Sequence, residues 1–173
     1  TLQGQSPYAA SKIGADQMVE AFARSHGTPA VTLRPFNTFG PRQSERAVIP
    51  TAIRQMLDPA CAEIRLGDLS TTRDFTFVGD TVRAFLAVGA ADGVEFGTAY
   101  NAGTGVEVEI GAVVSELRDI TGTNKPVVSD STRLRPEHSE VRALVADAAR
   151  LTALSGWRPE IALGDGLGLS VEW

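Results

Sequence analysis

The chain has 173 residues, of which 43% are hydrophobic and 21% charged; this composition is typical of a folded domain and not of a disordered segment. The formal net charge of −5 argues against nucleic-acid binding and against a polybasic membrane surface. No apolar run reaches the length of a membrane span, and no signal peptide is expected. A single cysteine, Cys61, excludes an internal disulfide, and two histidines argue against a metal site. We therefore expect no metal and a reducing, cytoplasmic compartment.

The first predicted element is a helix over residues 7–25. Ser6 can serve as its N-cap, a proline follows in the first turn, and apolar residues recur at helical spacing. Gly27 is expected to end the helix. Residues 30–34 then read as a short buried strand, and residues 36–45, rich in Gly, Pro, Asn and Ser, are predicted to form a loop.

Short strands and helices alternate in the rest of the chain. Strands are predicted over residues 63–66, 74–78, 98–101 and 144–146, and helices over 49–57, 80–91, 110–120, 147–154 and 163–173, with Asp80 and Asp147 as N-caps. Trp157 is expected in the core and Trp173 against the last helix. This alternation predicts an α/β protein with some parallel pairing. Because the helix over 7–25 has one strand after it and none before it, the sheet is expected to be incomplete.

The sharpest chemical motif is the pair Tyr8 and Lys12, four residues apart in the first helix. Side chains at this spacing lie on one helix face, about 5–6 Å apart between Cβ atoms. A neighbouring ammonium favours an ionised phenol, so such a pair suits acid–base chemistry. Lys12 could also donate hydrogen bonds to a ribose hydroxyl. By spacing alone, a surface tyrosine beside a surface lysine explains the pair at least as well.

The motif has a wider context. Residues 5–12, QSPYAASK, resemble the Tyr-x-x-x-Lys segment of extended short-chain dehydrogenases/reductases, and more narrowly that of nucleotide-sugar epimerases and dehydratases. Further segments resemble this family in the same order: LRPFN at 33–37, FGPR at 39–42, AVIP at 47–50, RDF at 73–75, YNAG at 100–103, RP at 135–136 and SGWRP at 155–159. Residues 2–8, 40–44 and 135–141 look most like the 4,6-dehydratases that act on UDP-N-acetylglucosamine or GDP-mannose.

The resemblance implies the C-terminal portion of an NAD-dependent nucleotide-sugar 4,6-dehydratase. Residues up to about 46 would end a Rossmann-type doubly wound sheet, and residues from about 47 to 173 would form mostly a small α/β substrate-binding subdomain. The N-terminal dinucleotide-binding half, with its glycine-rich phosphate loop, would be missing. The chain by itself is therefore expected to be inactive. The resemblance also implies a homodimer that forms through the helix over residues 7–25.

The family pattern also implies the catalytic and cofactor-binding residues. Tyr8 would exchange the proton of a sugar hydroxyl while hydride passes between sugar C4 and the nicotinamide. Lys12 would hold the nicotinamide ribose and polarise Tyr8. Pro35 and Phe36 would line the nicotinamide edge.

Eight further residues match family positions that bind the nucleotide-diphosphate sugar: Asn37, Arg42, Val48, Ile49, Pro50, Arg73, Arg135 and Glu137. Arg73 and Arg135 would hold the diphosphate from opposite walls, because a planar guanidinium meets two phosphate oxygens at once. Asn37 would donate to a phosphate, Arg42 would contact the diphosphate or sugar, and Glu137 would accept from a hydroxyl. The three apolar residues would pack against the nucleobase. From the residues alone, a turn-capping Asn37 and an ion-paired surface Arg73 stay open.

Two other functions fit the same residues. A nucleotide-sugar 4-epimerase passes through the same 4-keto intermediate, so Tyr8, Lys12 and Arg73 do not separate it from a dehydratase. A non-catalytic nucleotide-sugar-binding or dimerising fragment is the third interpretation.

Overall fold

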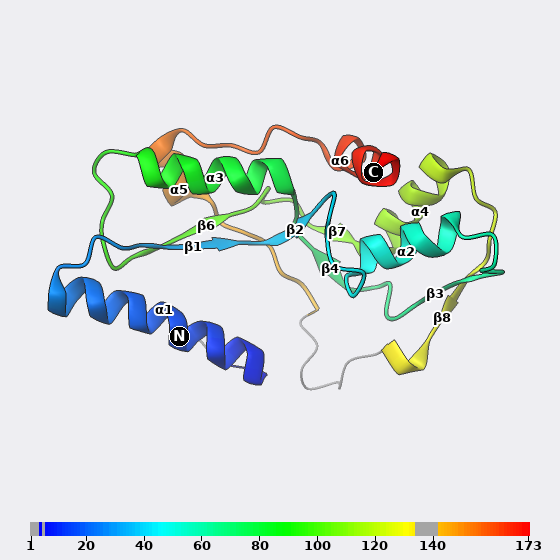
Figure 1. Cartoon of the computed structure of the whole chain (residues 1–173), viewed down its shortest axis with the longest axis horizontal. Helices are drawn as coiled ribbons and strands as arrows, with labels where there is room; N and C mark the ends of the chain where they lie inside the picture. The colour runs from blue at the N-terminus through cyan, green and yellow to red at the C-terminus, as the bar shows by residue number, and fades with distance from the viewer. Residues whose placement is uncertain (1–3, 5, 134–141) are drawn as a thin grey trace.

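The structure is a computed structural model that describes residue 4, residues 6–133 and residues 142–173. Its helices and strands alternate along the chain (Figure 1). The helices are α1 (Pro7–His26), α2 (Val48–Leu57), α3 (Val78–Ala90), α4 (Ile110–Thr121), α5 (Ala149–Ser155) and α6 (Leu163–Glu172), with a short 3-10 helix, η1 (Ser131–Arg133). The strands are β1 (Thr32–Pro35), β2 (Asn37–Phe39), β3 (Ile64–Leu66), β4 (Thr72–Arg73), β5 (Phe75–Phe77), β6 (Ala99–Ala102), β7 (Val108–Glu109) and β8 (Val127–Ser129). The predicted α/β class is confirmed.

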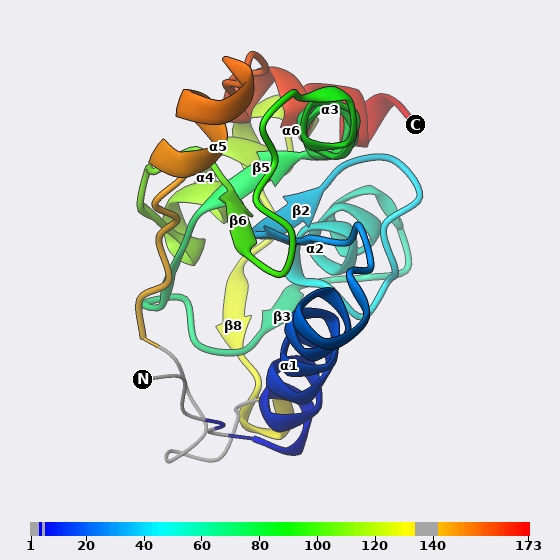
Figure 2. The same cartoon turned by 90° about the vertical axis from the view of Figure 1, so that its left-hand side faces the viewer.

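Strands that are distant in the sequence pair with each other. The pairs β1–β6, β2–β5 and β3–β8 are parallel, and β4 runs antiparallel to β7. The predicted parallel pairing is therefore confirmed. The strands β1 and β6 run between α1 on one side and α3 on the other (Figure 1, Figure 2). Within the described residues, β1 pairs along one edge only, with β6.

The helix α1 forms for local reasons and packs little. The Ser6 hydroxyl accepts a hydrogen bond from the backbone N–H of Ala9 at 3.1 Å, and Gly27, at φ 64°, ends the helix. An ion pair of 2.6 Å between Arg34 of β1 and Asp16 joins α1 to the sheet. None of the α1 residues is buried. Neither α1 nor any other described helix is long and apolar enough to cross a membrane.

The larger core lies between the helices α2, α4 and α6 and the strands β2, β3 and β5. Phe39 and Leu117 are almost completely buried in it. The Phe39 ring meets Phe75 and Phe77 edge to face, with centroids 6.1 and 5.7 Å apart. The helix α6 approaches these rings closely because residue 166 is glycine: a Cβ there would lie 2.7 Å from Phe39 Cζ.

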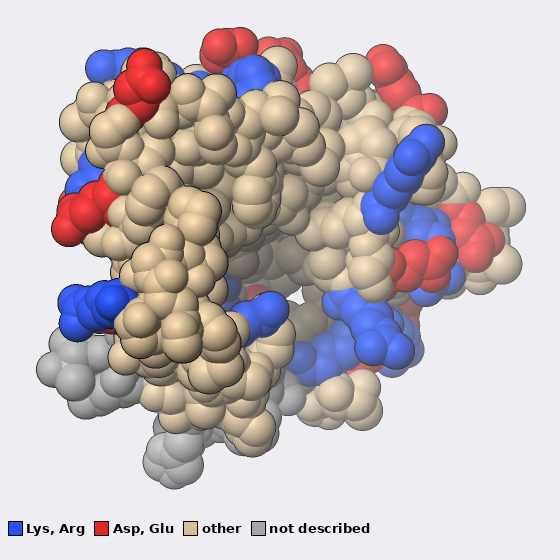
Figure 3. All heavy atoms as spheres, turned by 60° about the vertical axis from the view of Figure 1, so that its left-hand side comes forward, with Lys and Arg blue, Asp and Glu red and all other residues tan. Residues whose placement is uncertain are grey.

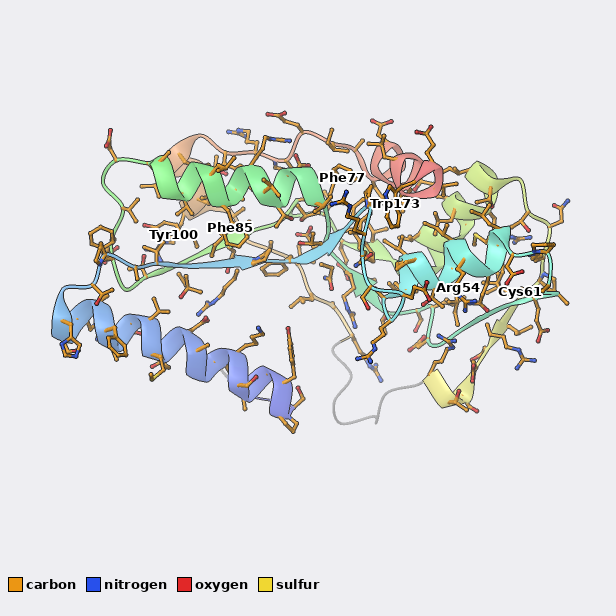
Figure 4. The ribbon with its side chains drawn as sticks, in the orientation of Figure 1. Arg54, Cys61, Phe77, Phe85, Tyr100 and Trp173 are labelled. Carbon is orange, nitrogen blue, oxygen red and sulfur yellow. The ribbon has the colours of Figure 1, made fainter. Side chains whose placement is uncertain are left out.

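A second core joins α3, α5 and β6. Tyr100, Leu151 and Trp157 are buried in it, which confirms the predicted placement of Trp157. Tyr100 and Phe77 mark the two cores in Figure 4, where they lie in separate parts of the molecule. Leu33 packs against this second core, so both cores take residues from before and after residue 46. The division of the chain near residue 46 stays a prediction.

Two local predictions in the first half are wrong. Residues 36–45 are not all loop, because β2 lies within them and pairs with β5. Asp80 does not cap α3, which begins two residues earlier at Val78. The Asp80 carboxylate is instead fully buried and accepts hydrogen bonds from the backbone N–H groups of Glu160 and Ile161 at 3.2 and 3.1 Å. The carboxylate thus ties α3 to the chain that leads into α6.

Two predictions near the C-terminus are also wrong. Residues 144–146 form no strand, although Asp74 N donates to Leu144 O at 3.0 Å. Trp173 does not pack against α6: its side chain is 71% exposed. One backbone bond from residues 144–146 to the neighbouring stretch of chain is too little pairing for a strand.

Candidate functional site

A cavity of about 900 Å³ opens where β2, β4 and the first turns of α2 and α4 meet. Its lining comprises Asn37, Thr38, Gln43, Arg46, Ala47, Val48, Ile49, Thr51, Leu66, Gly67, Asp68, Ser70, Thr71, Arg73, Phe75, Ile110, Arg133 and Arg142. We call it the arginine cavity, since four of these residues are arginines. Figure 3 shows Lys and Arg side chains on both sides of a hollow in the surface.

The arginine cavity carries an excess of positive charge. Against its four arginines, the described lining offers one carboxylate, that of Asp68. Hydrogen bonds from the Ser70 side chain and backbone hold the pKa of Asp68 below its usual value, and attraction to Arg142 lowers this pKa further. Asp68 is therefore ionised at neutral pH, yet the arginines outnumber it. A positive cavity in a chain of net charge −5 suits a ligand with more than one negative charge.

Arg73 and Asn37 reach the cavity from two different strands. Arg73 ends β4, where it lies opposite Val108 of β7, and its Nη1 donates to Thr72 O at 2.7 Å. Asn37 begins β2, and its amide Nδ2 donates to Asp74 O at 3.3 Å. The structure therefore brings these two predicted phosphate-binding residues together. Asn37 lies in a strand and does not cap a turn.

Of the other predicted substrate-binding residues, some line the arginine cavity and some do not. Val48 and Ile49 line the arginine cavity at the start of α2, although Ile49 is also a core residue with 2% exposure. Pro50 and Arg42 are not in the lining, and Arg42 is exposed, with a backbone φ of 67°. Arg135 and Glu137 lie outside the described residues.

Tyr8 and Lys12 lie on one face of α1, as the spacing predicts. The Lys12 ammonium is 5.5 Å from the centroid of the Tyr8 ring, and both side chains are exposed. Pro35 is exposed at the end of β1, and Phe36 N donates to Ala102 O at 2.8 Å. None of these four residues lines the arginine cavity. The first turns of α1 do lie on the side of the molecule where η1 is found (Figure 1, Figure 2).

Three further arginines line the cavity that were not predicted as site residues: Arg46, Arg133 and Arg142. Arg46 and Arg142 lie outside the helices and strands, and Arg133 ends a single 3-10 turn. No motif marks such positions. The one general signal was the scarcity of lysine: Lys12 and Lys125 are the only lysines among the 16 basic residues. An excess of arginine suits phosphate binding, because a planar guanidinium can donate to two phosphate oxygens at once.

Known proteins resemble the chain over nearly its full length. A family model described as GDP-mannose 4,6 dehydratase matches residues 1–168. GDP-6-deoxy-D-mannose reductase of Pseudomonas aeruginosa is 32% identical over 167 residues, which cover 94% of this chain and 54% of the relative. A dTDP-glucose 4,6-dehydratase of Actinoplanes sp. is 32% identical, with 99% and 52% covered. The solved UDP-glucuronic acid 4-epimerase of Bacillus cereus, in complex with UDP-glucuronic acid and NAD, gives a TM-score of 0.87 at 27% identity and covers 97% of this chain and 52% of that one.

These matches settle the family and leave the reaction type open. The chain spans about half the length of the curated relatives it matches. Reductase, dehydratase and epimerase all appear among them. The structural likeness is to Rossmann-like enzymes of the short-chain dehydrogenase/reductase type, as the motifs predict. The chain belongs to the GDP-mannose 4,6-dehydratase family of nucleotide-sugar dehydratases and epimerases.

Proposed function

We propose that the chain is the nucleotide-sugar-binding portion of an NAD-dependent nucleotide-sugar 4,6-dehydratase. The observation that carries this proposal is the arginine cavity, which gathers Asn37 and Arg73 in a positive setting beside the apolar Val48 and Ile49. A nucleotide-diphosphate sugar offers the matching pattern of two phosphates and a flat base. The relatives named above are, by their names, enzymes of nucleotide-linked sugars.

In this proposal the cavity binds the diphosphate through complementary donors. Arg73 presents a planar fork that can meet two phosphate oxygens. An amide nitrogen has two N–H groups, and Asn37 uses one of them on Asp74 O, so the other can donate to phosphate. Val48 and Ile49 supply the apolar wall against which the base packs. Arg135 and Glu137 stay predicted partners of the substrate.

The exposed pair on α1 fits the nicotinamide end of NAD, since phenol and ammonium are adjacent and accessible to a ligand. Bound NAD would supply the acceptor and donor of hydride. Tyr8 would take the proton from the C4 hydroxyl as that carbon is oxidised; because the dehydratase product keeps its 4-keto group, this proton would not be returned to O4. Lys12 would donate to the ribose hydroxyls and stabilise the ionised phenol. Pro35 and Phe36 would flank the ring.

A 4-epimerase is the second candidate, favoured by the structural likeness to a UDP-glucuronic acid 4-epimerase. The residues assigned above serve both reactions equally, because both oxidise sugar C4 first. The two reactions differ in what happens to the 4-keto sugar: a dehydratase removes water, and an epimerase returns hydride to the other face.

We also propose that α1 pairs with its copy in a homodimer. In this chain α1 buries none of its residues, and Met18 and Phe22 on it are 59% and 48% exposed. Apolar side chains at helical spacing suit a helix–helix contact. A monomer by analytical ultracentrifugation of the full-length protein at high concentration would contradict this pairing.

The test of the proposed function is product analysis with the full-length protein that contains this chain. GDP-mannose and UDP-N-acetylglucosamine are each incubated with the enzyme and NAD. A 4-keto-6-deoxy product, one water lighter than its substrate, is the expected result. A product of unchanged mass and inverted C4 indicates the epimerase. Binding of nucleoside diphosphates without turnover indicates a binding module, and no binding of either nucleotide contradicts the proposal.

A further inference from the structure

Arg142 lies beside Arg73 on the wall of the arginine cavity. The carbonyl of Arg142 accepts hydrogen bonds from Thr72 N at 2.9 Å and from Thr72 Oγ1 at 3.3 Å. Two residues further on, Leu144 O accepts from Asp74 N at 3.0 Å. The chain from 142 to 144 thus runs along the chain from 72 to 74. Both arginines line the cavity, one from each of these neighbouring stretches.

The guanidinium of Arg142 is available to a ligand. Within the part of the chain that the structure describes, it makes no hydrogen bond and no ion pair, and the residue is exposed. The nearby Asp68 carboxylate already accepts bonds from Ser70 N and Ser70 Oγ at 2.8 and 2.7 Å. A guanidinium has five N–H donors, so Arg142 brings unused donors to a cavity in which positive charge is already in excess.

The Asp74 carboxylate holds this arrangement together. Asp74 is completely buried. Its Oδ1 accepts from Thr104 N and Thr104 Oγ1 at 2.9 and 2.7 Å, and its Oδ2 accepts from Gly105 N and Ala146 N at 2.9 and 3.1 Å. These four donors come from two other stretches of chain, and one of them, Ala146, closes the stretch that begins with Arg142.

The chain also packs closely around Asp74 at Gly103. A Cβ on Gly103 would collide with the Cβ of Ala146 and lie 2.7 Å from Asp74 Oδ2. Only glycine therefore lets the turn before Thr104 come near enough to donate to the carboxylate. The glycine and the aspartate together fix the stretch from 142 to 146 against β4.

We propose that Arg142 is a second anion-binding residue of the arginine cavity, next to Arg73, and that the buried carboxylate of Asp74 is the positioning residue that keeps it there. The proposal rests on the proposed function in taking the diphosphate of a nucleotide sugar as the anion. Two neighbouring guanidinium forks match two linked phosphates, because each fork can meet two oxygens of one phosphate. Asp74 acts through Arg142 and does not touch the ligand.

The first experiment measures binding to the full-length protein by isothermal titration calorimetry. The probes are inorganic pyrophosphate, UDP and GDP, with uridine and guanosine as ligands without phosphate. Arg142→Ala should raise the Kd of the phosphorylated probes about tenfold or more, the usual effect of losing a charged hydrogen bond. Arg142→Lys should recover part of the loss. Arg158→Ala, which removes an exposed arginine outside the cavity, should leave every Kd within about twofold. Equal results for Arg142→Ala and Arg158→Ala overturn the anion-binding role.

The second experiment isolates Asp74 by comparing it with Asp80, the other aspartate of the described residues that is completely buried. Asp74→Asn and Asp80→Asn should both lower the melting temperature, but only Asp74→Asn should weaken pyrophosphate binding, by several-fold. Because Asp74 acts through Arg142, the double variant should lose less affinity than the two single losses combined. Additive losses, or equal pyrophosphate affinities for the two aspartate variants, overturn the positioning role.

A milder variant separates a loss of binding from a failure to fold, and the set of probes separates the role of Arg142 from the proposed function. If Asp74→Asn does not fold, Thr104→Val removes the hydroxyl that donates to Asp74 at 2.7 Å and accepts from Val106 N at 3.1 Å, and it should also weaken pyrophosphate binding. If the wild-type protein binds pyrophosphate in an Arg142-dependent manner but binds neither UDP nor GDP, the proposed function fails and the role of Arg142 stands.

Discussion

The arginine cavity and the Tyr8–Lys12 pair would serve one reaction, yet they differ in how much of the chain packs around them. In the cavity walls, the buried Asp74 carboxylate accepts hydrogen bonds from Thr104, Gly105 and Ala146, and the larger core packs against α2 and α4. The pair on α1 is exposed and is carried by a helix that buries none of its own residues. In the proposed function, the chain holds its substrate-binding residues in place through its own packing, whereas the acid–base pair on α1 has little of the chain packed around it.

The first way to test this contrast is to change the exposed pair. Tyr8→Phe in the full-length protein should lower kcat by about two to four orders of magnitude, the usual effect of a general acid–base group. Nucleotide binding by calorimetry should stay within about twofold, because Tyr8 does not line the arginine cavity. A variant that keeps more than about a tenth of the wild-type rate would contradict the acid–base role.

The stability of the chain should depend most on the larger core. Leu117 is 0% exposed there, so Leu117→Ala should lower the free energy of unfolding by about 2–5 kcal/mol. Urea denaturation followed by circular dichroism measures the loss. A cost near zero would show that the larger core does not hold the described fold together.

Arg73→Ala should act on binding and spare the chemical step. Losing one charged hydrogen bond should weaken nucleotide-sugar binding by about 1.5–3 kcal/mol and leave kcat close to that of the wild type. Steady-state kinetics and calorimetry separate the two effects. An unchanged dissociation constant would remove Arg73 from the site.

The smallest effect is expected on the outer surface of α1. Phe22→Ala should change the unfolding free energy of the chain by no more than about 0.5 kcal/mol, since the side chain is 48% exposed and lies outside both cores. The same variant should weaken dimerisation of the full-length protein if α1 pairs with its copy. A large stability loss in the chain alone would contradict the loose packing of α1.

Local signals in the sequence predicted much of this fold. Ser6, the proline after it and Gly27 placed the first helix within one residue of its observed end, because caps act through neighbouring backbone groups. The i, i+4 spacing of Tyr8 and Lys12 held for the same reason. The prediction that Asp80 caps its own helix was wrong, because a buried carboxylate can instead accept hydrogen bonds from backbone that is distant in the sequence, here from Glu160 and Ile161.

The candidate site was predictable where residues sit in motifs and unpredictable elsewhere. Asn37 and Arg73 belong to recognisable segments, and the structure brings them together at the arginine cavity. Arg142 reaches the same wall only because its carbonyl bonds to Thr72, a contact across 70 residues. No local pattern records a pairing of that range, so this arginine could be found only in three dimensions.

The one-sided pairing of β1 has a practical consequence for handling the polypeptide. A short strand with an unmatched edge presents backbone donors and acceptors that can template another strand, and natural sheets usually protect such edges. Among its four residues, Thr32 N already donates to Thr98 O on the β6 side and Pro35 has no N–H, which leaves Leu33 and Arg34 as possible donors at the unpaired edge. Expressed by itself, this chain should therefore self-associate through that edge.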